Sequence, residues 1–412
     1  MFKKIFVFLF MVLLAGCARQ YHPVFWRGDT SPATETHKKA PTVAALLPLS
    51  GQSKSVGESL KNAALMSAFE NRQTPVKVLF FDTEGTEGGA EQAYQWALAQ
   101  RPDIVLGPVF SKEVAAVQKS GISVPLLTFS SDTSLMNYKT GTMAVTVPEQ
   151  IRQMVRYACR NNQLRLGVLG PESKTGEISM NALAEEIQSC PGMNMAKISL
   201  YEADTMNFTK AVQDILPPII DADKPNLSEK EKAELAKPMS ERAGLDAIFV
   251  FEEGIKLRQL LSILAFYDAG PRDIPVYTFA VVGQINDNSV NGAYFADLDE
   301  TNYRNFAQKY QTSFGRAPTR IASQMYDALS WIFSEVASGN SVSLSDLQQK
   351  SRYWGVDGLI HLNSDGTNRR ALQLKQKRGS RSVLVEAAED DFSSLSNANV
   401  GGFMGQEATL AY

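Results

Sequence analysis

The chain has 412 residues, of which 44% are hydrophobic and 21% charged, a composition that allows two globular lobes with separate cores. Its net charge of −3 at pH 7 provides no broad basic field, so we expect no nucleic-acid partner. The chain has only three histidines, and two of them, His22 and His37, lie near the N-terminus, so we expect no metal site and no cofactor.

Residues 1–17 have the pattern of an export signal. Lys3 and Lys4 precede an apolar run over residues 5–15, which is too short to span a bilayer as a helix. The run closes on small residues before Cys17 and resembles the lipobox of bacterial lipoproteins, which implies cleavage before Cys17 and acylation of that cysteine. Ala18 in place of Asp resembles a sorting signal for the outer membrane. We therefore expect a lipid anchor on the periplasmic face of that membrane, the alternative being an ordinary signal peptide with an incidental cysteine.

A polar segment over residues 18–41 follows, and it predicts a flexible tether. From Thr42 onward, short apolar strands alternate with amphipathic helices, a pattern typical of parallel sheets covered by helices. We expect strands over 43–47, 76–81, 104–106 and 126–128, with helices over 59–70, 90–100 and 112–119. The alternation restarts after Pro148 with helices over 149–160, 178–189 and 257–267 and strands over 166–169, 196–199, 247–251 and 276–278. The sequence thus predicts an α/β fold of two doubly wound, mostly parallel units.

Two segments interrupt this pattern. A charged run flanked by prolines over residues 217–244 predicts an insertion on one lobe, with Ser228 able to cap a short surface helix. The insertion is either a solvated surface or a helix that docks a partner. Residues 389–412 are polar and glycine-rich, which predicts a disordered tail.

Ligands of open parallel sheets bind beyond the carboxyl ends of the strands, where loops lead into helices. The candidate ligand-binding residues are therefore those that the expected loops present there. They are Ser50, Ser111, Ser130, Ser131, Asp132, Thr175 and Glu252. Each serine could instead cap a helix or form a turn, so the hypothesis depends on their convergence.

Several segments in sequence order resemble known binding proteins. The segments Ala44–Gly51, Phe81–Thr83, Val105–Pro108 and Val124–Thr128 resemble the opening of type I periplasmic binding proteins of the Leu/Ile/Val-binding kind. A closer resemblance, to LpoA/YraM-type penicillin-binding-protein activators, is carried by Leu245–Val250, Ile274–Tyr277, Asn291–Asp297 and Gly355–Gly358. The resemblance implies two lobes joined by three crossings of the chain. The expected first lobe is 42–147 plus 299–345, and the second is 148–298 plus 346–388.

The resemblance also suggests roles for four residues. Ser111 falls where a hydroxyl of the amino-acid binders holds the ligand carboxylate, and Ser130 falls at a neighbouring backbone contact. Asp132 replaces a threonine that contacts both ligand charges, and Thr175 replaces an aromatic residue. A carboxylate at position 132 would repel a ligand carboxylate in a partly desolvated cleft. We therefore expect no tight binding of free branched-chain amino acids.

The sequence contains no Gly-x-Ser-x-Gly elbow, P-loop or histidine pair, so we expect no enzymatic activity. Two binding functions remain. In the first, the lipoprotein binds and activates a peptidoglycan synthase, that is, a penicillin-binding protein. In the alternative, it is the substrate-binding lipoprotein of an ABC transporter and captures a small polar or amino-acid-like ligand.

Once Cys17 carries lipid, Cys159 and Cys190 are the remaining two thiols, and export would place them in an oxidising compartment. Each lies at the end of an expected helix, and both helices run antiparallel to the strands, so their ends emerge at the same edge of the second lobe. We predict a disulfide between these cysteines; two buried free thiols are the alternative.

Overall fold

The computed structural model describes residues 40–221, 225–349 and 352–392. The export signal, Cys17, almost all of the tether and residues 393–412 of the expected tail lie outside these residues. No helix in the described part of the chain is long and apolar enough to cross a membrane.

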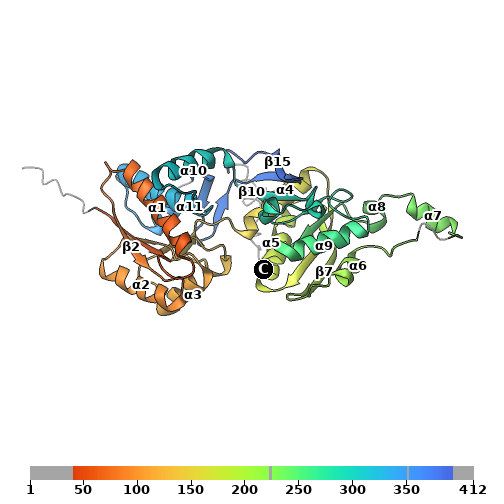
Figure 1. The fold of residues 1–412 in the computed structure, drawn as a ribbon, viewed down its shortest axis with the longest axis horizontal. Coiled ribbons are helices and arrows are strands. Elements are labelled where there is room, and N and C mark those ends of the chain that lie inside the picture. Colours follow the sequence, from red (N-terminus) through yellow and green to blue (C-terminus); the bar gives the residue numbers. More distant parts are fainter. Residues whose placement is uncertain (1–39, 222–224, 350–351, 393–412) are drawn as a thin grey trace, which may run out of the picture. The chain divides into compact units, whose positions relative to one another are not determined.

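The first lobe is built on a parallel five-stranded sheet (Figure 1). Its strand order is β2-β1-β3-β4-β5, formed by β1 (Thr42–Leu47), β2 (Lys77–Asp82), β3 (Ile104–Leu106), β4 (Leu126–Thr128) and β5 (Thr140–Thr142). All six residues of β1 are buried, because helices cover both faces of the sheet. One face packs on α1 (Lys54–Glu70), α10 (Glu300–Phe314) and α11 (Ala322–Ala337); the other packs on α2 (Glu87–Ala99) and α3 (Ser111–Ser120).

The second lobe contains a seven-stranded sheet in the order β15-β14-β10-β9-β8-β6-β7. Five strands are parallel: β6 (Arg165–Glu172), β7 (Asn194–Glu202), β8 (Ala247–Val250), β9 (Val276–Tyr277) and β10 (Tyr294–Asp297). The antiparallel hairpin of β14 (Gln373–Arg378) and β15 (Arg381–Glu386) extends the sheet beyond β10. Helices α4 (Val147–Arg160) and α5 (Lys174–Glu186) cover one face, and α6 (Thr209–Ile215) and α9 (Gly254–Phe266) cover the other. The predicted α/β architecture of two doubly wound lobes is confirmed.

The chain passes between the two hydrophobic cores three times. The first two crossings follow β5 and β10, where the sequence placed them, but the third differs. A small antiparallel sheet of β11 (Tyr353–Gly355), β12 (Gly358–Leu362) and β13 (Asn368–Arg370) contributes Ile360 and Leu362 to the first core, as does α12 (Leu344–Gln349) through Leu347. Leu372 and Leu374 then belong to the second core, so the crossing lies near Ala371 and not between residues 345 and 346, the boundary expected from the sequence. Assigning all of 346–388 to the second lobe was wrong, because apolar strands in sequence do not reveal which core they join.

The insertion forms α7 (Glu229–Leu235) and α8 (Met239–Ala243). Ser228 caps α7 as predicted, since its hydroxyl accepts from the Glu231 N–H while the Glu231 carboxylate accepts from the Ser228 N–H. α7 has no buried residue and projects from the second lobe at the right of Figure 1.

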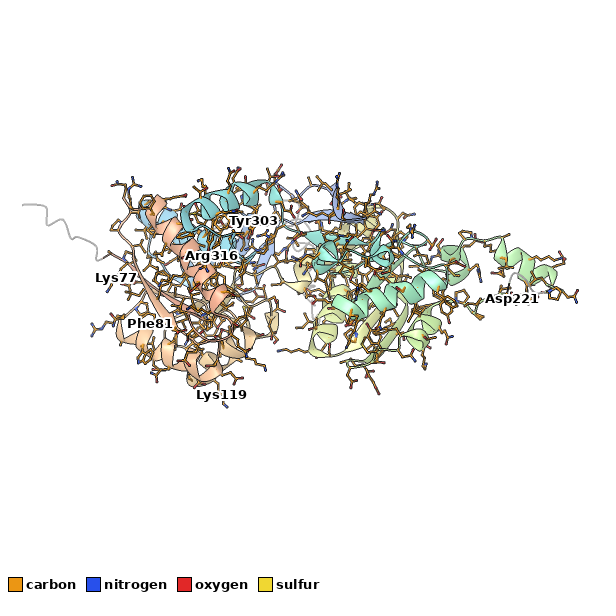
Figure 2. All side chains as sticks on the ribbon, in the orientation of Figure 1. Lys77, Phe81, Lys119, Asp221, Tyr303 and Arg316 are labelled. Carbon is orange, nitrogen blue, oxygen red and sulfur yellow. A yellow bond between two sulfur atoms is a disulfide. The ribbon has the colours of Figure 1, made fainter. Side chains whose placement is uncertain are left out.

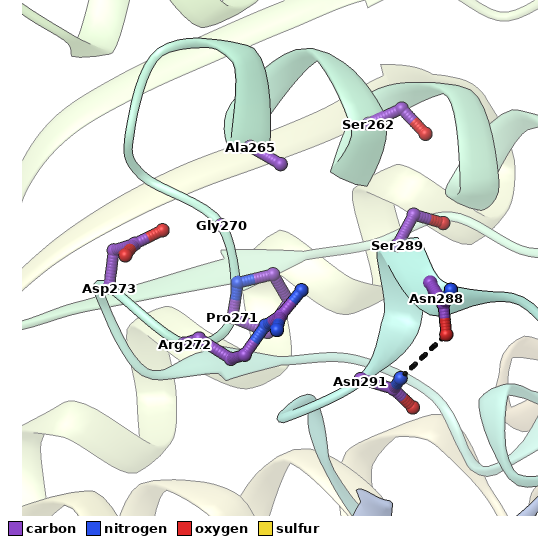
Figure 3. Close-up of a pocket in the computed structure, with 9 residues that line it drawn as sticks. All are labelled: Ser262, Ala265, Gly270, Pro271, Arg272, Asp273, Asn288, Ser289 and Asn291. Carbon is purple, nitrogen blue, oxygen red and sulfur yellow. Dashed lines mark hydrogen bonds between the residues drawn. The ribbon is translucent and has the colours of Figure 1, made fainter. Parts of the chain in front are cut away.

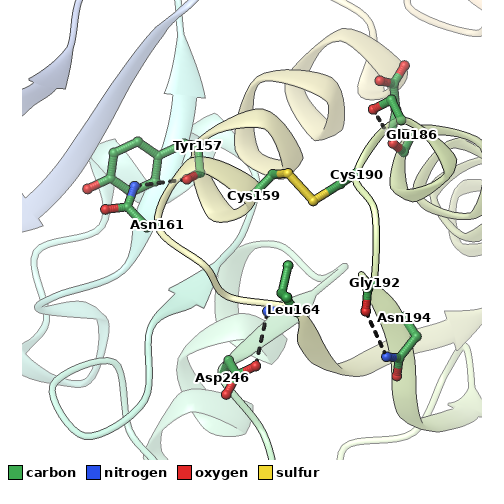
Figure 4. Close-up of a disulfide and its surroundings, with 10 residues drawn as sticks. Tyr157, Cys159, Asn161, Leu164, Glu186, Cys190, Gly192, Asn194 and Asp246 are labelled. Atoms are coloured by element: carbon green, nitrogen blue, oxygen red, sulfur yellow. Dashed lines mark hydrogen bonds between the residues drawn. A yellow bond between two sulfur atoms is a disulfide. The ribbon is translucent and has the colours of Figure 1, made fainter.

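The predicted disulfide is present. Cys159 at the end of α4 and Cys190 after α5 have Cα atoms 6.0 Å apart and are joined through their sulfurs (Figure 4). The bridge links the ends of two helices that pack on the same face of the second sheet.

Candidate functional site

A cavity of about 520 Å³ is lined by residues from both lobes. Phe129 and Ser131 follow β4 of the first sheet, and residues 280–284 follow β9 of the second, so the cavity lies at the carboxyl ends of parallel strands. Ala144, of the first crossing, and Leu298, of the second, also line it. Its volume is typical of small-molecule sites, and its position is where the two sheets are expected to bind a ligand.

Arg320 and Gln324 supply polar groups from the start of α11. The Arg320 Nη1 donates to Ser323 Oγ over 2.8 Å and to Asp357 Oδ1 over 2.7 Å. Its guanidinium lies 4.1 Å over the ring of Tyr303, which is labelled in Figure 2. Gln324 is 8% exposed, and its Oε1 is buried with no hydrogen-bond partner among the described residues. A buried amide oxygen without a donor is costly, so Gln324 is suited to contact a ligand.

Lys375 forms another charged part of this lining. Its Nζ lies 3.0 Å from Asp297 Oδ2 and 3.3 Å from Glu300 Oε1, and it also donates to the Leu298 carbonyl. These contacts leave the lysine charge compensated within the protein. The cavity therefore combines a paired charge cluster with apolar walls from Phe129, Ile321 and Phe295, among others.

Asp132 contacts the opposite lobe. Its Oδ2 accepts from Lys174 Nζ over 2.8 Å, and its Oδ1 accepts from the Ser134 hydroxyl over 2.6 Å. Burial by itself would raise the pKa of Asp132, but the bonds from Lys174 and Ser134 outweigh it and hold the pKa below its usual value. The carboxylate is thus ionised but paired. The repulsion of a ligand carboxylate expected from the sequence is partly neutralised by Lys174.

All four predicted serines lie near the ends of first-lobe strands, but they do not converge on one site. Ser50 is tied to Asp82, whose Oδ1 accepts from the Ser50 N–H over 3.2 Å. Ser130 is 4% exposed, and its Oγ accepts from the Asp132 N–H. Ser111 begins α3 and does not line the cavity. Of the predicted serines, only Ser131 lines it.

The two second-lobe candidates also lie outside the cavity lining. Thr175 is exposed in the first turn of α5. Glu252 follows β8, and its Oε2 is buried without a hydrogen-bond partner among the described residues. Burial raises the pKa of Glu252 above its usual value. The hydroxyl of Tyr201, on β7, is likewise buried and has no hydrogen-bond partner among the described residues. Two buried polar groups near the carboxyl ends of β7 and β8 therefore lack partners in the described part of the chain.

Sequence reasoning missed Arg320, Gln324 and Lys375. Arg320 and Gln324 flank the start of a helix that packs on the first sheet, and Lys375 lies on an antiparallel strand, so none belongs to a loop at the end of a parallel strand. The polar positions in an apolar stretch of α11 were the available signal for Gln324. Only the crossings of the chain bring these residues into the same cavity lining as Ser131.

A second cavity, of about 500 Å³, lies wholly within the second lobe (Figure 3). It is bounded by the end of α9, the loop over residues 270–273 and the short 3-10 helix Asn288–Val290. It contains none of the predicted ligand residues. Among the described residues, no group of three or more His, Cys, Asp or Glu side chains is arranged to hold a metal ion.

The two lobes, each with a parallel sheet covered by helices, have the type I periplasmic-binding-protein fold. Residues 41–217 match the family model described as periplasmic binding protein. No curated protein matches the chain.

Solved structures with this fold span most of the chain. A putative branched-chain amino acid ABC transporter protein from Rhodospirillum rubrum is 17% identical, with a TM-score of 0.67, over 84% of this chain and 100% of that one. A branched-chain amino acid ABC transporter periplasmic ligand-binding protein from Burkholderia xenovorans is 14% identical, with a TM-score of 0.64, over 87% and 98%. LivJ from Streptococcus pneumoniae, solved with isoleucine, is 15% identical, with a TM-score of 0.53, over 84% and 100%. At these identities the likeness concerns the fold alone.

Proposed function

We propose that the protein binds a small polar ligand between its lobes and delivers it to an ABC transporter, as a substrate-binding protein. The observation that carries this proposal is the cavity of about 520 Å³ lined from both lobes. Solved structures of the same fold support it: the Rhodospirillum rubrum and Burkholderia xenovorans proteins are ABC-transporter proteins, and LivJ is a transporter substrate-binding protein. The function is binding and not catalysis, in keeping with the absence of catalytic motifs from the sequence.

The lining indicates the kind of ligand. Phe129, Ile321 and Phe295 favour an apolar body, whereas Gln324 and Arg320 favour a polar group that exchanges hydrogen bonds with an amide and a guanidinium. Lys375 is matched by Asp297 and Glu300, so the charge in the lining is mixed. An amphiphilic ligand of amino-acid size fits this combination.

The test is a thermal-shift screen of amino acids and muropeptides, followed by calorimetry on each compound that stabilises the protein. Gln324→Leu should weaken binding of such a compound by about tenfold or more, because a buried polar contact is lost. Ser262→Ala, in the separate cavity of Figure 3, is the matched control and should leave binding unchanged. Equal affinities for wild type and Gln324→Leu would contradict the assignment of the cavity.

A second function, activation of a peptidoglycan synthase, is favoured by the insertion. α7 has no buried residue and lies in a proline-flanked segment. Its alternating acidic and basic side chains are exposed and do not pack on the core. The expected outer-membrane anchor at Cys17 also fits a partner other than an inner-membrane transporter. Crosslinking pull-downs separate the two functions. Recovery of transporter subunits, together with a ligand-dependent thermal shift, supports the first function. Recovery of a penicillin-binding protein by the wild type, but not by the double variant Lys230→Glu with Lys232→Glu, supports the second.

A further inference from the structure

One face of α4 carries a row of arginines. Arg152, Arg156 and Arg160 are spaced four residues apart, so their side chains project from the same side of the helix. Arg369 of β13 joins this row, and its guanidinium faces the same carboxylate, Glu149, as that of Arg152. The side chains of Arg152, Arg156 and Arg369 are only about one-fifth exposed. Arginines buried to this degree need anionic partners.

Two of the four carboxylates that face these arginines come from the body of the second lobe. Glu149, on α4 itself, pairs with Arg152 and lies 3.5 Å from Arg369 Nε. Glu186, at the end of α5, accepts from Arg152 Nε over 2.6 Å. Glu149 is 4% exposed, and burial raises its pKa, so it is a poor counter-ion for the whole row.

The other two carboxylates belong to the C-terminal segment over residues 386–392, which we call the strap. It begins at the last residue of β15, where Glu386 pairs with Arg160 and also accepts from Gln153. Glu389 then pairs with Arg156, and Phe392 closes a small recess beside it. The recess retains about 10 Å³, room for about one water molecule. The strap thus places two carboxylates on the row and fills the space in front of it.

Without the strap, four guanidiniums would face two carboxylates, one of them fully buried. Guanidinium groups bind tetrahedral oxyanions through paired N–H donors, and a multivalent anion can replace two separate carboxylates. The strap holds its place through Glu386, Glu389 and Phe392, with a further ion pair between Asp391 and Arg352. Contacts of this kind, at partly exposed side chains, are individually weak and can be exchanged for a stronger ligand.

We propose that the arginine row of α4, with Arg369, is a binding site for a phosphate group, which displaces the carboxylates of the strap. The site shares no lining residue with the cavity between the lobes. It is therefore a second ligand site, independent of the proposed transport function. Its recessed, half-buried arginines suit one compact oxyanion and not an extended polyanion. The phosphate comes either from the free anion or from the headgroup of an anionic phospholipid.

The test uses the full chain with Cys17→Ser, so that no acyl chain contributes to membrane binding. The probes are inorganic phosphate, with chloride at equal ionic strength as the reference, and vesicles of phosphatidylglycerol, with phosphatidylcholine as the reference. We expect Arg156→Gln to weaken phosphate binding by about tenfold, through the loss of a charge-assisted contact. Glu389→Gln removes the competing carboxylate and should tighten binding by several-fold. Arg272→Gln and Glu177→Gln, exposed residues outside the site, are the matched controls.

The outcomes are distinct. Arginine-dependent binding of free phosphate assigns the site to the free anion, and arginine-dependent binding of phosphatidylglycerol vesicles alone assigns it to a lipid headgroup. If Arg156→Gln and Glu389→Gln bind both probes as the wild type does, the proposal is overturned. Circular dichroism of each variant separates loss of the site from loss of folding, and Glu389→Gln, at a partly exposed position, tests the site without disturbing the core.

Discussion

The stability of the first lobe should depend on the protonation of Asp327. This residue lies in α11, is 2% exposed and accepts from the backbone N–H groups of Val356, over 2.7 Å, and Asp357, over 3.1 Å. The Asp357 carboxylate, which pairs with Arg320 and Ser323, lies next to it, and Arg370 is the other nearby cation. Burial, followed by the charge of Asp357, raises the pKa of Asp327 to about 7. The bonds from the backbone and the charge of Arg370 oppose this rise without cancelling it.

The direction of the effect follows from proton binding. An aspartate in the unfolded chain releases its proton near pH 4, whereas folded Asp327 keeps it to about pH 7. The folded state therefore binds more protons between these values, and the free energy of unfolding falls as the pH rises through this window. A difference of about three pH units corresponds to at most about 4 kcal/mol.

The experiment compares urea unfolding of wild type and Asp327→Asn at pH 5 and pH 8. Trp331 reports on the same core, because it is 1% exposed and stacks on Tyr353 with ring centroids 5.2 Å apart. We expect the wild type to lose stability from pH 5 to pH 8 by up to about 4 kcal/mol more than the variant. A pH-independent effect of the asparagine on the free energy of unfolding cancels in this comparison. Asp365→Asn, at an exposed turn, is the control and should retain the wild-type dependence. Equal pH dependence in wild type and Asp327→Asn would refute the reasoning.

Three further predictions concern the anchor, the disulfide and the cleft. Cys17→Ser should move the protein from the membrane fraction to the soluble fraction, and its retention in membranes would contradict the lipoprotein assignment. Cys159→Ala with Cys190→Ala should lower the free energy of unfolding by roughly 3–4 kcal/mol, because the bridge spans 31 residues of the unfolded chain. Denaturant unfolding measures this loss, and alkylation of both thiols in the unreduced wild type would show that the bridge does not form. Leucine and valine should not bind with micromolar or tighter constants in calorimetry, because Lys174 already pairs with the Asp132 carboxylate and is not free to hold a ligand carboxylate. Lys174→Met, which leaves the Asp132 charge without this partner, should weaken any residual binding further.

The sequence by itself predicted the apolar strands that are buried on both faces. β3 and β4 begin and end where expected, because short apolar runs bounded by polar residues or proline have few other interpretations. Helix starts were less accurate: α1 begins at Lys54 and not at Ser59, since its first turn is polar and lacks the apolar spacing used to find it. β5 was missed because its three residues, Thr140–Thr142, are not apolar although all are buried.

A cavity lies where the sequence predicts a ligand site, but its lining differs from the predicted residues. The cavity is at the carboxyl ends of the strands, and this location could be predicted because strand polarity in a parallel sheet follows directly from the alternation of strands and helices. The side chains could not be predicted in the same way, since the Ser50 side chain bonds to the Asp82 carboxylate and the Ser130 hydroxyl accepts from the Asp132 N–H, and neither residue lines the cavity. Local hydrogen bonds determine the orientation of each serine, and the sequence pattern does not reveal these bonds.

Only the tertiary structure brought Arg320, Gln324 and Ser131 into the lining of one cavity, and Arg156 into an ion pair with Glu389. Each of these pairs joins residues far apart in sequence, and the third crossing of the chain decides which lobe β12 and β13 join. The disulfide depends on both the sequence and the tertiary structure. Expected export and the cysteine count indicated it, whereas the packing of α4 and α5 on one face brought the sulfurs together. Local periodicity determines which elements form, whereas contacts between distant elements depend on how the cores pack, and therefore on the whole chain.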